Sequence, residues 1–391
     1  MNYILFDGTA RNQLLPFTYT RPVADIRIGI LTIREKWEAH LQTTTSTVTE
    51  DYLEAQWPMV EFADNVMINA SYLPTHNLVK IVKGLGPNQA IFDGEEVIAF
   101  YIQEDAEVNF ETYDIIEYTF KDLFRVAQTW DIFSKNHRAI TEDYALLTQD
   151  RNSQPIPEQV IAINASQIFI EDGAVLPYCS LNASEGPIYI GKNAHIMEGA
   201  LIRGPFALCE EATVKMGAKI YGGTTIGPHS KVGGEVNNAV IFGYSNKGHD
   251  GFIGNTVIGE WCNLGADTNT SNLKNNYAEV RLWDYQSEGF ARTGLQFCGL
   301  MMGDHSKCGI NTMFNTGTVV GVSANIFGSG FPRNFIPSFS WGGSAGLTTY
   351  KTAKAFEVAK VVMARRKITF DKTTEAILQQ VFEDTATYRR D

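Results

Sequence analysis

Polar side chains suited to acid–base chemistry gather in the middle of the chain, between residues 233 and 272. Lys247 and His249 stand two positions apart, and Asn263 and Asn272 follow in the next polar stretch. An imidazole with an ordinary pKa of about 6.5 accepts a proton near neutral pH, so His249 is the candidate general base. A solvent-exposed histidine and asparagines that stabilise backbone corners are the alternative interpretation.

Cations in and around this region are candidate partners for a phosphate group, with solvated surface charge as the alternative. They are Arg203, Lys219, Lys247 and Lys274.

A second candidate site lies near the N-terminus. An apolar segment, residues 3–6, runs into the glycine-containing turn of residues 7–11, and residues 24–40 have the apolar spacing of a helix. A strand, a glycine turn and a helix in succession present backbone N–H groups to a phosphate. The same pattern also fits a turn that binds nothing.

The element that must position the central residues is a repeat with a period of six. Aliphatic residues recur without interruption at positions Ile190, Ile196, Ile202, Leu208, Val214, Ile220, Ile226 and Val232. Small residues and glycines beside these positions suit tight corners between short strands. The six-residue step is broken at Asn238 and resumes, with an inserted loop at residues 269–296, through Phe252, Ile258, Leu264, Met302, Cys308, Phe314, Val320 and Ile326. Cys308 is therefore expected inside the core, as a small hydrophobic residue.

Two helices are predicted after the repeat. Residues 350–368 have apolar side chains at helical spacing with cations near the end, and residues 373–382 resemble a second, shorter helix. An apolar solenoid end needs a cover, so a bracing role is the better interpretation of both helices.

The repeat resembles that of the hexapeptide acyltransferases, whose coils form a left-handed parallel β-helix. The resemblance implies an α/β nucleotidyltransferase-like domain at residues 1–155, a left-handed parallel β-helix at residues 156–342 and a short helical extension at residues 343–391. Coils of this kind associate as homotrimers, so a homotrimer is implied as well.

Residues 233–272 resemble the acetyltransferase half of the GlmU family. The Gly-His pair and the Asn-hydrophobic-Gly-Ala stretch carry the match, which implies His249 as the general base and Ala266 as a backbone contact to acetyl-CoA. Asn263 and Asn272 match asparagines that bind the sugar or its amine. The resemblance also implies contacts to the coenzyme at Gly303, Asp304 and Val322. Departures from the family pattern are Phe252 in place of a tyrosine and Asn237 in place of a lysine.

The N-terminal segment resembles the signature of sugar-1-phosphate nucleotidyltransferases. Gly8 and Arg11 match the glycine turn and arginine that hold a nucleotide triphosphate, while Arg21 stands in the family's Pro-Lys region. Residues 66–71 stand where the family has a strand that ends in Gly-Asp, and the magnesium-binding aspartate of that motif is missing here. A magnesium ion is thus possible in this domain, and an active and a degenerate nucleotidyltransferase site both stay open.

Composition limits the partners. The formal net charge of −12 disfavours a nucleic-acid surface, and no apolar run reaches membrane-spanning length. Five cysteines without a Cys-x-x-Cys pair fit neither a disulfide framework nor a zinc knuckle. With no signal sequence evident, a reducing cytoplasm is the expected location.

The resemblances together imply transfer of an acetyl group from acetyl-CoA to an amino-sugar phosphate, with possible sugar-1-phosphate nucleotidyl transfer from a nucleotide triphosphate. UDP-N-acetylglucosamine is the end product of that family. One alternative is a non-catalytic assembly protein whose degenerate sites bind a sugar nucleotide. Another is a zinc enzyme of the β-helical carbonic anhydrase type, which would need His229, His249 and His305 around one ion.

Overall fold

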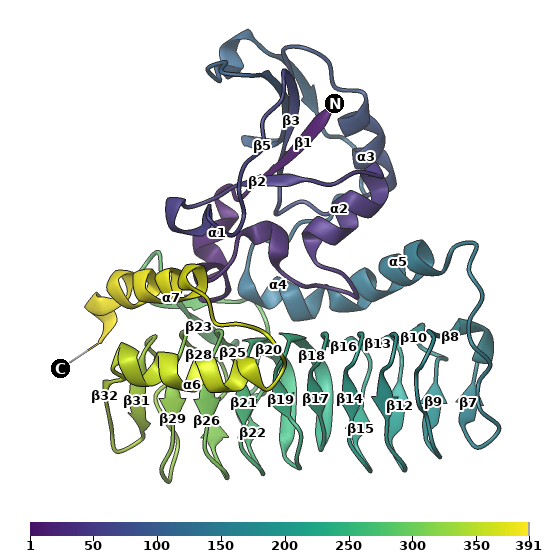
Figure 1. The fold of residues 1–391 in the computed structure, drawn as a ribbon, viewed down its shortest axis with the longest axis vertical. Helices are drawn as coiled ribbons and strands as arrows, with labels where there is room; N and C mark the ends of the chain where they lie inside the picture. The colour runs from purple at the N-terminus through teal and green to yellow at the C-terminus, as the bar shows by residue number, and fades with distance from the viewer. Residues whose placement is uncertain (390–391) are drawn as a thin grey trace. The chain divides into compact units, whose positions relative to one another are not determined.

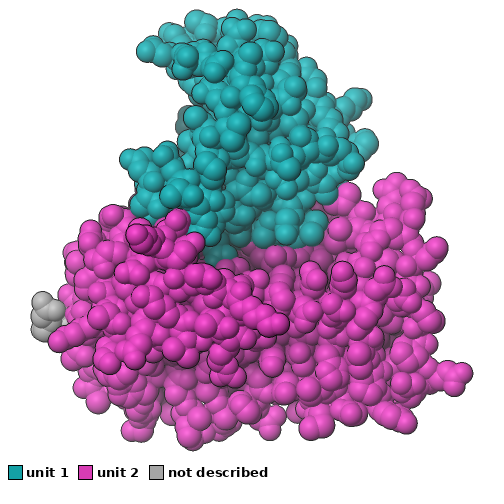
Figure 2. Space-filling model, viewed as in Figure 1, with its two compact units in different colours: residues 1–14, 20–26, 31–128 teal, residues 15–19, 27–30, 129–391 magenta. Residues whose placement is uncertain are grey.

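Two units, each with its own sheet system, make up the chain. The computed structural model describes residues 1–389. Unit 1 comprises residues 1–14, 20–26 and 31–128, whereas unit 2 comprises residues 15–19, 27–30 and the chain from Thr129 onward (Figure 2). Two short N-terminal segments therefore belong with the C-terminal unit.

A six-stranded mixed sheet forms unit 1, in the order β2-β1-β3-β5-β4-β6 (Figure 1). Its strands are β1 Asn2–Phe6, β2 Ser46–Val48, β3 Asp64–Asn69, β4 Gln89–Asp93, β5 Glu96–Gln103 and β6 Asp114–Glu117. Its α-helices are α1 Ala10–Gln13, α2 Ile33–Leu41 and α3 His76–Lys83. The parallel pairing of β1 with β3 sets Phe6 beside Asn69, so the glycine turn and Asn69 emerge at the same sheet edge.

The helix expected over residues 24–40 is shorter than predicted. Only α2, from Ile33, is a regular helix, and Thr32 begins it with a capping box to Glu35. Residues 23–25 form a single 3-10 turn, and Gly29 takes φ +75°, which an α-helix does not accommodate. Apolar spacing alone did not reveal this break.

Unit 2 contains a parallel β-solenoid whose strands stack in three ladders (Figure 1). The first ladder contains β7 Ile161–Ile163, β9 Ser180–Asn182, β12 Leu201–Arg203, β15 Lys219–Ile220, β22 Asn269–Thr270 and β27 Met313–Phe314. The second contains β8 Ile168–Ile170, β10 Ile188–Ile190, β13 Phe206–Leu208, β16 Thr224–Ile226, β25 Leu300–Met302, β28 Thr318–Val320 and β30 Phe335–Ile336. The third contains β11 His195–Ile196, β14 Thr213–Val214, β17 Lys231–Val232, β19 Asn246–Lys247, β21 Asn263–Leu264, β26 Lys307–Cys308, β29 Asn325–Ile326 and β31 Ser340–Gly343, the last paired antiparallel with β32 Gly346–Thr349.

Two long strands, β18 Glu235–Gly243 and β20 Phe252–Glu260, belong to the first and second ladders at once. They shorten the coils: Leu208 pairs with Ile226 eighteen positions on, but Ile226 pairs with Ile241 only fifteen positions on. This is the break that the sequence places at Asn238.

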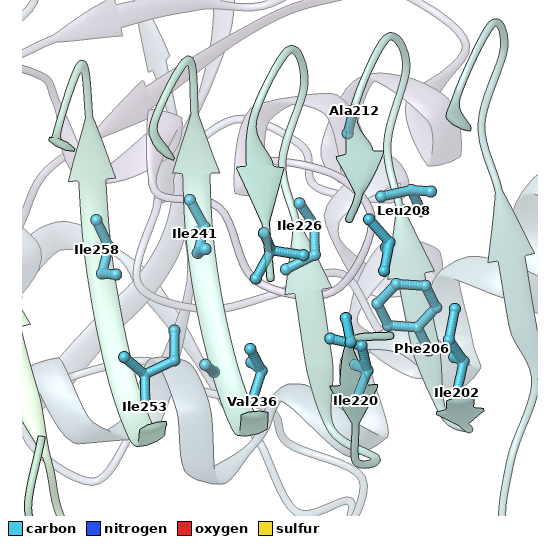
Figure 3. Packing of buried hydrophobic residues seen from close by; sticks show 14 of the residues in the cluster. Ile202, Phe206, Leu208, Ala212, Ile220, Ile226, Val236, Ile241, Ile253 and Ile258 are labelled. Atoms are coloured by element: carbon cyan, nitrogen blue, oxygen red, sulfur yellow. The ribbon is translucent and has the colours of Figure 1, made fainter. Parts of the chain in front are cut away.

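The interior of the solenoid is the predicted aliphatic core. All eight residues of the unbroken six-step run are buried in one cluster, as are Leu264, Cys308 and Phe314. Figure 3 shows part of this cluster, including Ile202, Leu208, Ile220 and Ile226. The prediction for Phe252 is wrong, because Ile253 takes the inward position instead. Within β20 the inward residues Ile253 and Ile258 are five apart, since the continuous strand turns from one ladder to the next without a full corner.

Insertions and helices complete unit 2. The predicted inserted loop contains an antiparallel hairpin of β23 Arg281–Asp284 and β24 Gly289–Arg292. Before the solenoid, α4 Thr129–Ser134 packs against β18 and β20, and α5 Asn136–Thr148 packs against β16. After it, α6 Thr352–Ala364 and α7 Lys372–Asp384 confirm the two predicted helices. Within residues 1–389, none of the helices combines the length and apolarity needed to cross a bilayer.

Candidate functional site

His249 lies in the corner between β19 and β20, where the third ladder turns into the first. The residue is exposed, and its imidazole makes no hydrogen bond or ion pair with the described part of the chain, residues 1–389. The corner is stacked on the next one, because Asp267 donates its backbone N–H to the carbonyl of Asp250 at 3.0 Å. The imidazole is therefore free to meet a ligand at an edge of the solenoid.

Ala266 lies at the same edge, one coil further on. Its carbonyl accepts the backbone N–H of Asn311 at 2.8 Å, which ties it to the following coil. Asn263, on β21, is exposed and is paired in register with Asn246 on one side and Lys307 on the other. The structure thus brings His249, Asn263 and Ala266 onto consecutive coils around one edge.

Lys247 lies inside the solenoid, where it is 1% exposed. Its ammonium donates to the carbonyls of His249 at 2.5 Å and Asp250 at 2.8 Å. Burial lowers the pKa of Lys247 to about 8. The sequence expectation of a substrate contact does not agree with this position, because the ammonium points inward and contacts the protein's own backbone.

Asn272 lies at the other end of the first-ladder strand, away from the His249 corner. Its amide donates to the side-chain oxygen of Asn255 at 2.8 Å, and its carbonyl accepts from the backbone N–H of Cys298 at 2.9 Å. Asn272 thereby joins β20 to the base of the insertion.

The other three predicted coenzyme contacts lie at a different edge, where the second ladder turns into the third. The carboxylate of Asp304 accepts from the backbone N–H of Glu260 at 2.8 Å and is 3% exposed. Val322 is fully buried, and its N–H donates to Ser338 at 3.0 Å. Because Gly303 accepts from the Cys262 thiol at 3.2 Å, all three residues have structural contacts at this edge.

An aromatic stack occupies that second edge and was not predicted. The rings of His229 and Tyr244 are 4.9 Å apart, those of Tyr244 and Trp261 4.3 Å, and those of Trp261 and His305 6.2 Å. All four residues have left-handed backbone with φ between 51° and 61°. The signal in the sequence was an aromatic residue recurring at about one coil length.

This stack bears on the zinc alternative. It holds His229 and His305 at the second edge, whereas His249 occupies the first. Across residues 1–389, no group of three or more histidine, cysteine, aspartate or glutamate side chains is placed to hold a metal ion.

The remaining cations are engaged at the surface. Lys219 pairs with Glu235 at 3.8 Å, and Arg203 pairs with Glu185 at 3.3 Å. Lys274 donates to the carbonyl of Glu279 at 2.9 Å. Exposed ion pairs such as those of Lys219 and Arg203 contribute little to stability. Little free energy is therefore lost if either cation leaves its carboxylate and binds a ligand.

Lys307 is a half-buried cation that the sequence interpretation missed. Its ammonium donates to the carbonyl of His305 at 2.7 Å, and burial lowers its pKa to about 8.

In unit 1, Gly8 has φ +58° in the predicted turn, and Arg11 is 7% exposed. Arg11 contacts the carboxylates of Asp7 at 2.8 Å and Glu50 at 3.1 Å, and it donates to Tyr52 at 3.0 Å. Burial raises the pKa of Asp7 although Arg11 opposes the shift. Arg21 is buried as well, at 6% exposed.

Asn69 stands at the end of β3, facing this turn. Its amide donates to the carbonyl of Val97 at 3.1 Å, and its side-chain oxygen accepts from the hydroxyl of Ser71 at 2.8 Å. The nearby carboxylate of Glu96 accepts from Thr9 at 2.7 Å. Because the oxygen of Asn69 is already bound, these residues do not fit a magnesium site in this conformation.

The glycine turn offers a stability test. A methyl group at Gly8 would lie 2.8 Å from the Asn69 amide, and the left-handed backbone disfavours any side chain. Gly8→Ala is expected to destabilise the protein by roughly 1–2 kcal/mol. Urea denaturation of the variant measures this loss, with Gly94→Ala as the matched control. Gly94 also has positive φ, 60°, but open space around its Cα, so an equal loss in both variants would exclude the Asn69 contact as a cause.

The two candidate sites lie in an N-terminal unit built on a six-stranded mixed sheet and in a parallel β-solenoid. Residues 3–152 match the family model described as "Sugar nucleotidyl transferase". The chain is 29% identical over 142 residues to the "Uncharacterized acetyltransferase YaiX" of Escherichia coli O6:K15:H31, which covers 36% of this chain and 61% of the relative. It is 30% identical over 118 residues to the "Bifunctional protein GlmU" of Methanocaldococcus jannaschii, covering 30% of this chain and 26% of that protein. The expected likeness to GlmU is thereby confirmed.

Solved structures resemble parts of the chain at low identity. The "polySia specific acetyltransferase NeuO" aligns with a TM-score of 0.30 and 14% identity, covering 54% of this chain and 99% of that one. The acetyltransferase domain of PglB from Neisseria gonorrhoeae, solved with acetyl coenzyme A, aligns with a TM-score of 0.18 and 10% identity over 89% of this chain and 98% of that one.

Proposed function

We propose that the chain transfers an acetyl group from acetyl-CoA to the amine of an amino-sugar phosphate, with His249 as the general base. The observation that carries the proposal is the unengaged, exposed imidazole at a solenoid edge. The chain's similarity to an acetyltransferase and to GlmU supports it. The proposed enzyme works as a homotrimer in the cytoplasm.

The proposed reaction uses the residues around this edge. The substrate ammonium loses one proton to solvent, and His249 accepts a second proton as the amine nitrogen attacks the thioester carbonyl. A carbon–nitrogen bond forms, the carbon–sulfur bond breaks, and the leaving thiolate takes the proton from the imidazolium. The backbone N–H of Ala266 is suited to stabilise the oxyanion that develops, whereas the N–H groups of Gly265 and Asp267 beside it donate to carbonyls of the adjacent coils. The exposed amide of Asn263 is placed one coil away, where it can bind the sugar.

The test is release of free thiol. Purified protein is incubated with acetyl-CoA and a panel of amino-sugar 1-phosphates and 6-phosphates, and the thiol and the acetylated sugar are measured together. We expect one member of the panel to give both products in equal amounts. Absence of thiol release with every amino sugar would exclude the proposal.

For unit 1 we propose sugar-nucleotide binding without nucleotidyl transfer. The observation that favours this second function is the absence of the expected aspartate from residues 66–71, where the side-chain oxygen of Asn69 already accepts from the Ser71 hydroxyl. Calorimetry with a sugar nucleotide is expected to detect binding. An assay with nucleotide triphosphate, sugar 1-phosphate and magnesium is expected to release no pyrophosphate, and pyrophosphate release would overturn this proposal.

A further inference from the structure

Lys247 occupies a position that belongs to the aliphatic core. It pairs in register with Val232 on the preceding third-ladder strand, and the inward residues of the neighbouring coils are apolar. They are Ile196, Val214, Val232, Leu264, Cys308 and Ile326. A single ammonium thus lies within a column of six uncharged side chains.

No carboxylate hydrogen-bonds to this ammonium within residues 1–389. Its two acceptors are the carbonyls of His249 and Asp250, which form the corner itself. Asp250, Asp267 and Cys308 are the titratable groups whose charges act on it. The buried cation is therefore bound to the backbone that carries the candidate base.

The two following coils hold the same corner differently. Thr268 donates its hydroxyl to the carbonyl of Gly265 at 2.7 Å, and Thr312 donates to the carbonyl of Gly309 at 2.8 Å. In both coils the threonine stands four positions after the inward residue of the third ladder, Leu264 or Cys308. The equivalent position in the His249 coil is Gly251, which has no hydroxyl to donate.

A threonine does not fit at Gly251. A Cβ there would lie 2.2 Å from the carbonyl oxygen of Thr268, and Gly251 has φ 113°. The ammonium of Lys247 therefore supplies, from the interior, the donor that a threonine hydroxyl supplies in the neighbouring corners. It reaches the carbonyls of residues 249 and 250, so this corner is held at the histidine itself.

We propose that Lys247 is a positioning residue, which holds the 248–251 corner so that the His249 imidazole faces the substrate. This inference rests on the proposed acyl transfer. A buried charge without a carboxylate partner costs stability, and an apolar side chain of similar length would fill the same space. The gain that offsets this cost is the fixed orientation of His249, which matters because a misplacement of about 1 Å can reduce a rate roughly 100-fold.

The test compares Lys247→Met with the matched control Thr312→Val, which removes the corner hydrogen bond from a coil without the histidine. In Lys247→Met we expect kcat to fall at least tenfold while KM for acetyl-CoA changes less than twofold. Amide hydrogen exchange over residues 248–252 is expected to accelerate at least tenfold at Phe252, whose N–H donates to the Asn269 side chain at 2.8 Å. The control is expected to accelerate exchange only around its own corner and to leave kcat within twofold of the wild type.

Lys247→Gln is the second variant, used if the methionine variant does not fold. The shorter amide still donates, so intermediate exchange rates are expected. Hydrogen exchange reports on the corner even if the wild type transfers no acetyl group, which separates failure of this inference from failure of the proposed function. The positioning role would be overturned if Lys247→Met and Lys247→Gln both exchanged residues 248–252 at the wild-type rate. An unchanged kcat in these two variants would overturn it as well.

Discussion

Replacing His249 with glutamine is expected to lower kcat for acyl transfer by about 10²–10⁴-fold, the range that general-base catalysis contributes. Glutamine keeps the polarity and approximate length of the side chain but accepts no proton at neutral pH. The corner is held through the carbonyl of His249 rather than its ring. The variant should therefore fold as the wild type does.

The matched control is His195→Gln. His195 lies on β11 of the same solenoid, paired in register with Thr213, several coils from the candidate site. Steady-state rates of thiol release are measured for both variants at saturating acetyl-CoA, and circular dichroism confirms their folding. Activity of His249→Gln within threefold of the wild type would assign the base to another group.

The β-helix was predictable because one physical constraint repeats along the chain. An inward aliphatic residue at every sixth position fills the solenoid, and Ile190 to Val232 show this without interruption. The prediction failed where the chain departs from that step. Within β20 the inward residues are five apart, so the six-residue count selected Phe252 instead of Ile253.

The candidate site was predictable only in part. His249 is exposed beside the break in the repeat, and its role as the general base stays a prediction. Lys247 was misplaced because a lysine is expected to face solvent, and nothing in the spacing shows that this one replaces an absent threonine at Gly251. Asp304 was expected near the coenzyme, but its carboxylate caps the backbone of Glu260 at another edge. Its hydrogen bond depends on a fold in which residues 44 positions apart become neighbours.

Unit 1 shows the same contrast between what the sequence pattern predicts and the contacts that only the folded chain reveals. In unit 1 the order of strand, glycine turn and helix was visible, and the family model confirms the domain. What the order did not show is that Arg11 is already bound by Asp7 and Glu50. These carboxylates come from the turn itself and from a segment 39 residues away, so only the folded chain reveals that they surround the arginine.

Lys247→Met is also expected to stabilise the protein near neutral pH. The pKa of Lys247 is about 8 in the folded chain, against 10.5 for the ordinary side chain. Below pH 8 both the folded and the unfolded state carry the proton, and the folded state bears the cost of a buried charge. At 1.36 kcal/mol per pKa unit this cost is about 3 kcal/mol, from which the loss of two hydrogen bonds to carbonyls must be subtracted.

The advantage of the methionine variant should shrink as the pH rises. Between pH 8 and pH 10.5 the folded wild type has already lost the proton that the unfolded chain still binds, so the wild type gains stability with pH. The gain is expected to approach 3 kcal/mol relative to the variant, which lacks the titrating ammonium of residue 247. Lys307, whose pKa is also lowered to about 8, is common to both chains and cancels in the comparison.

The measurement is urea denaturation of wild type and Lys247→Met at pH 7 and pH 10, with Thr312→Val as a variant that changes no charge. Burial raises the pKa of the Cys308 thiol and the neighbouring Lys247 ammonium opposes this shift, so the thiol is expected to titrate at a still higher pH in the methionine variant. A pH-independent difference between Lys247→Met and wild type would show that the lysine is not buried as a cation. A variant that is less stable at pH 7 and still slow in acyl transfer would instead mean that the ammonium stabilises the whole solenoid. The combination expected here, a more stable protein with a slower reaction, arises only if the buried charge serves the corner that carries His249.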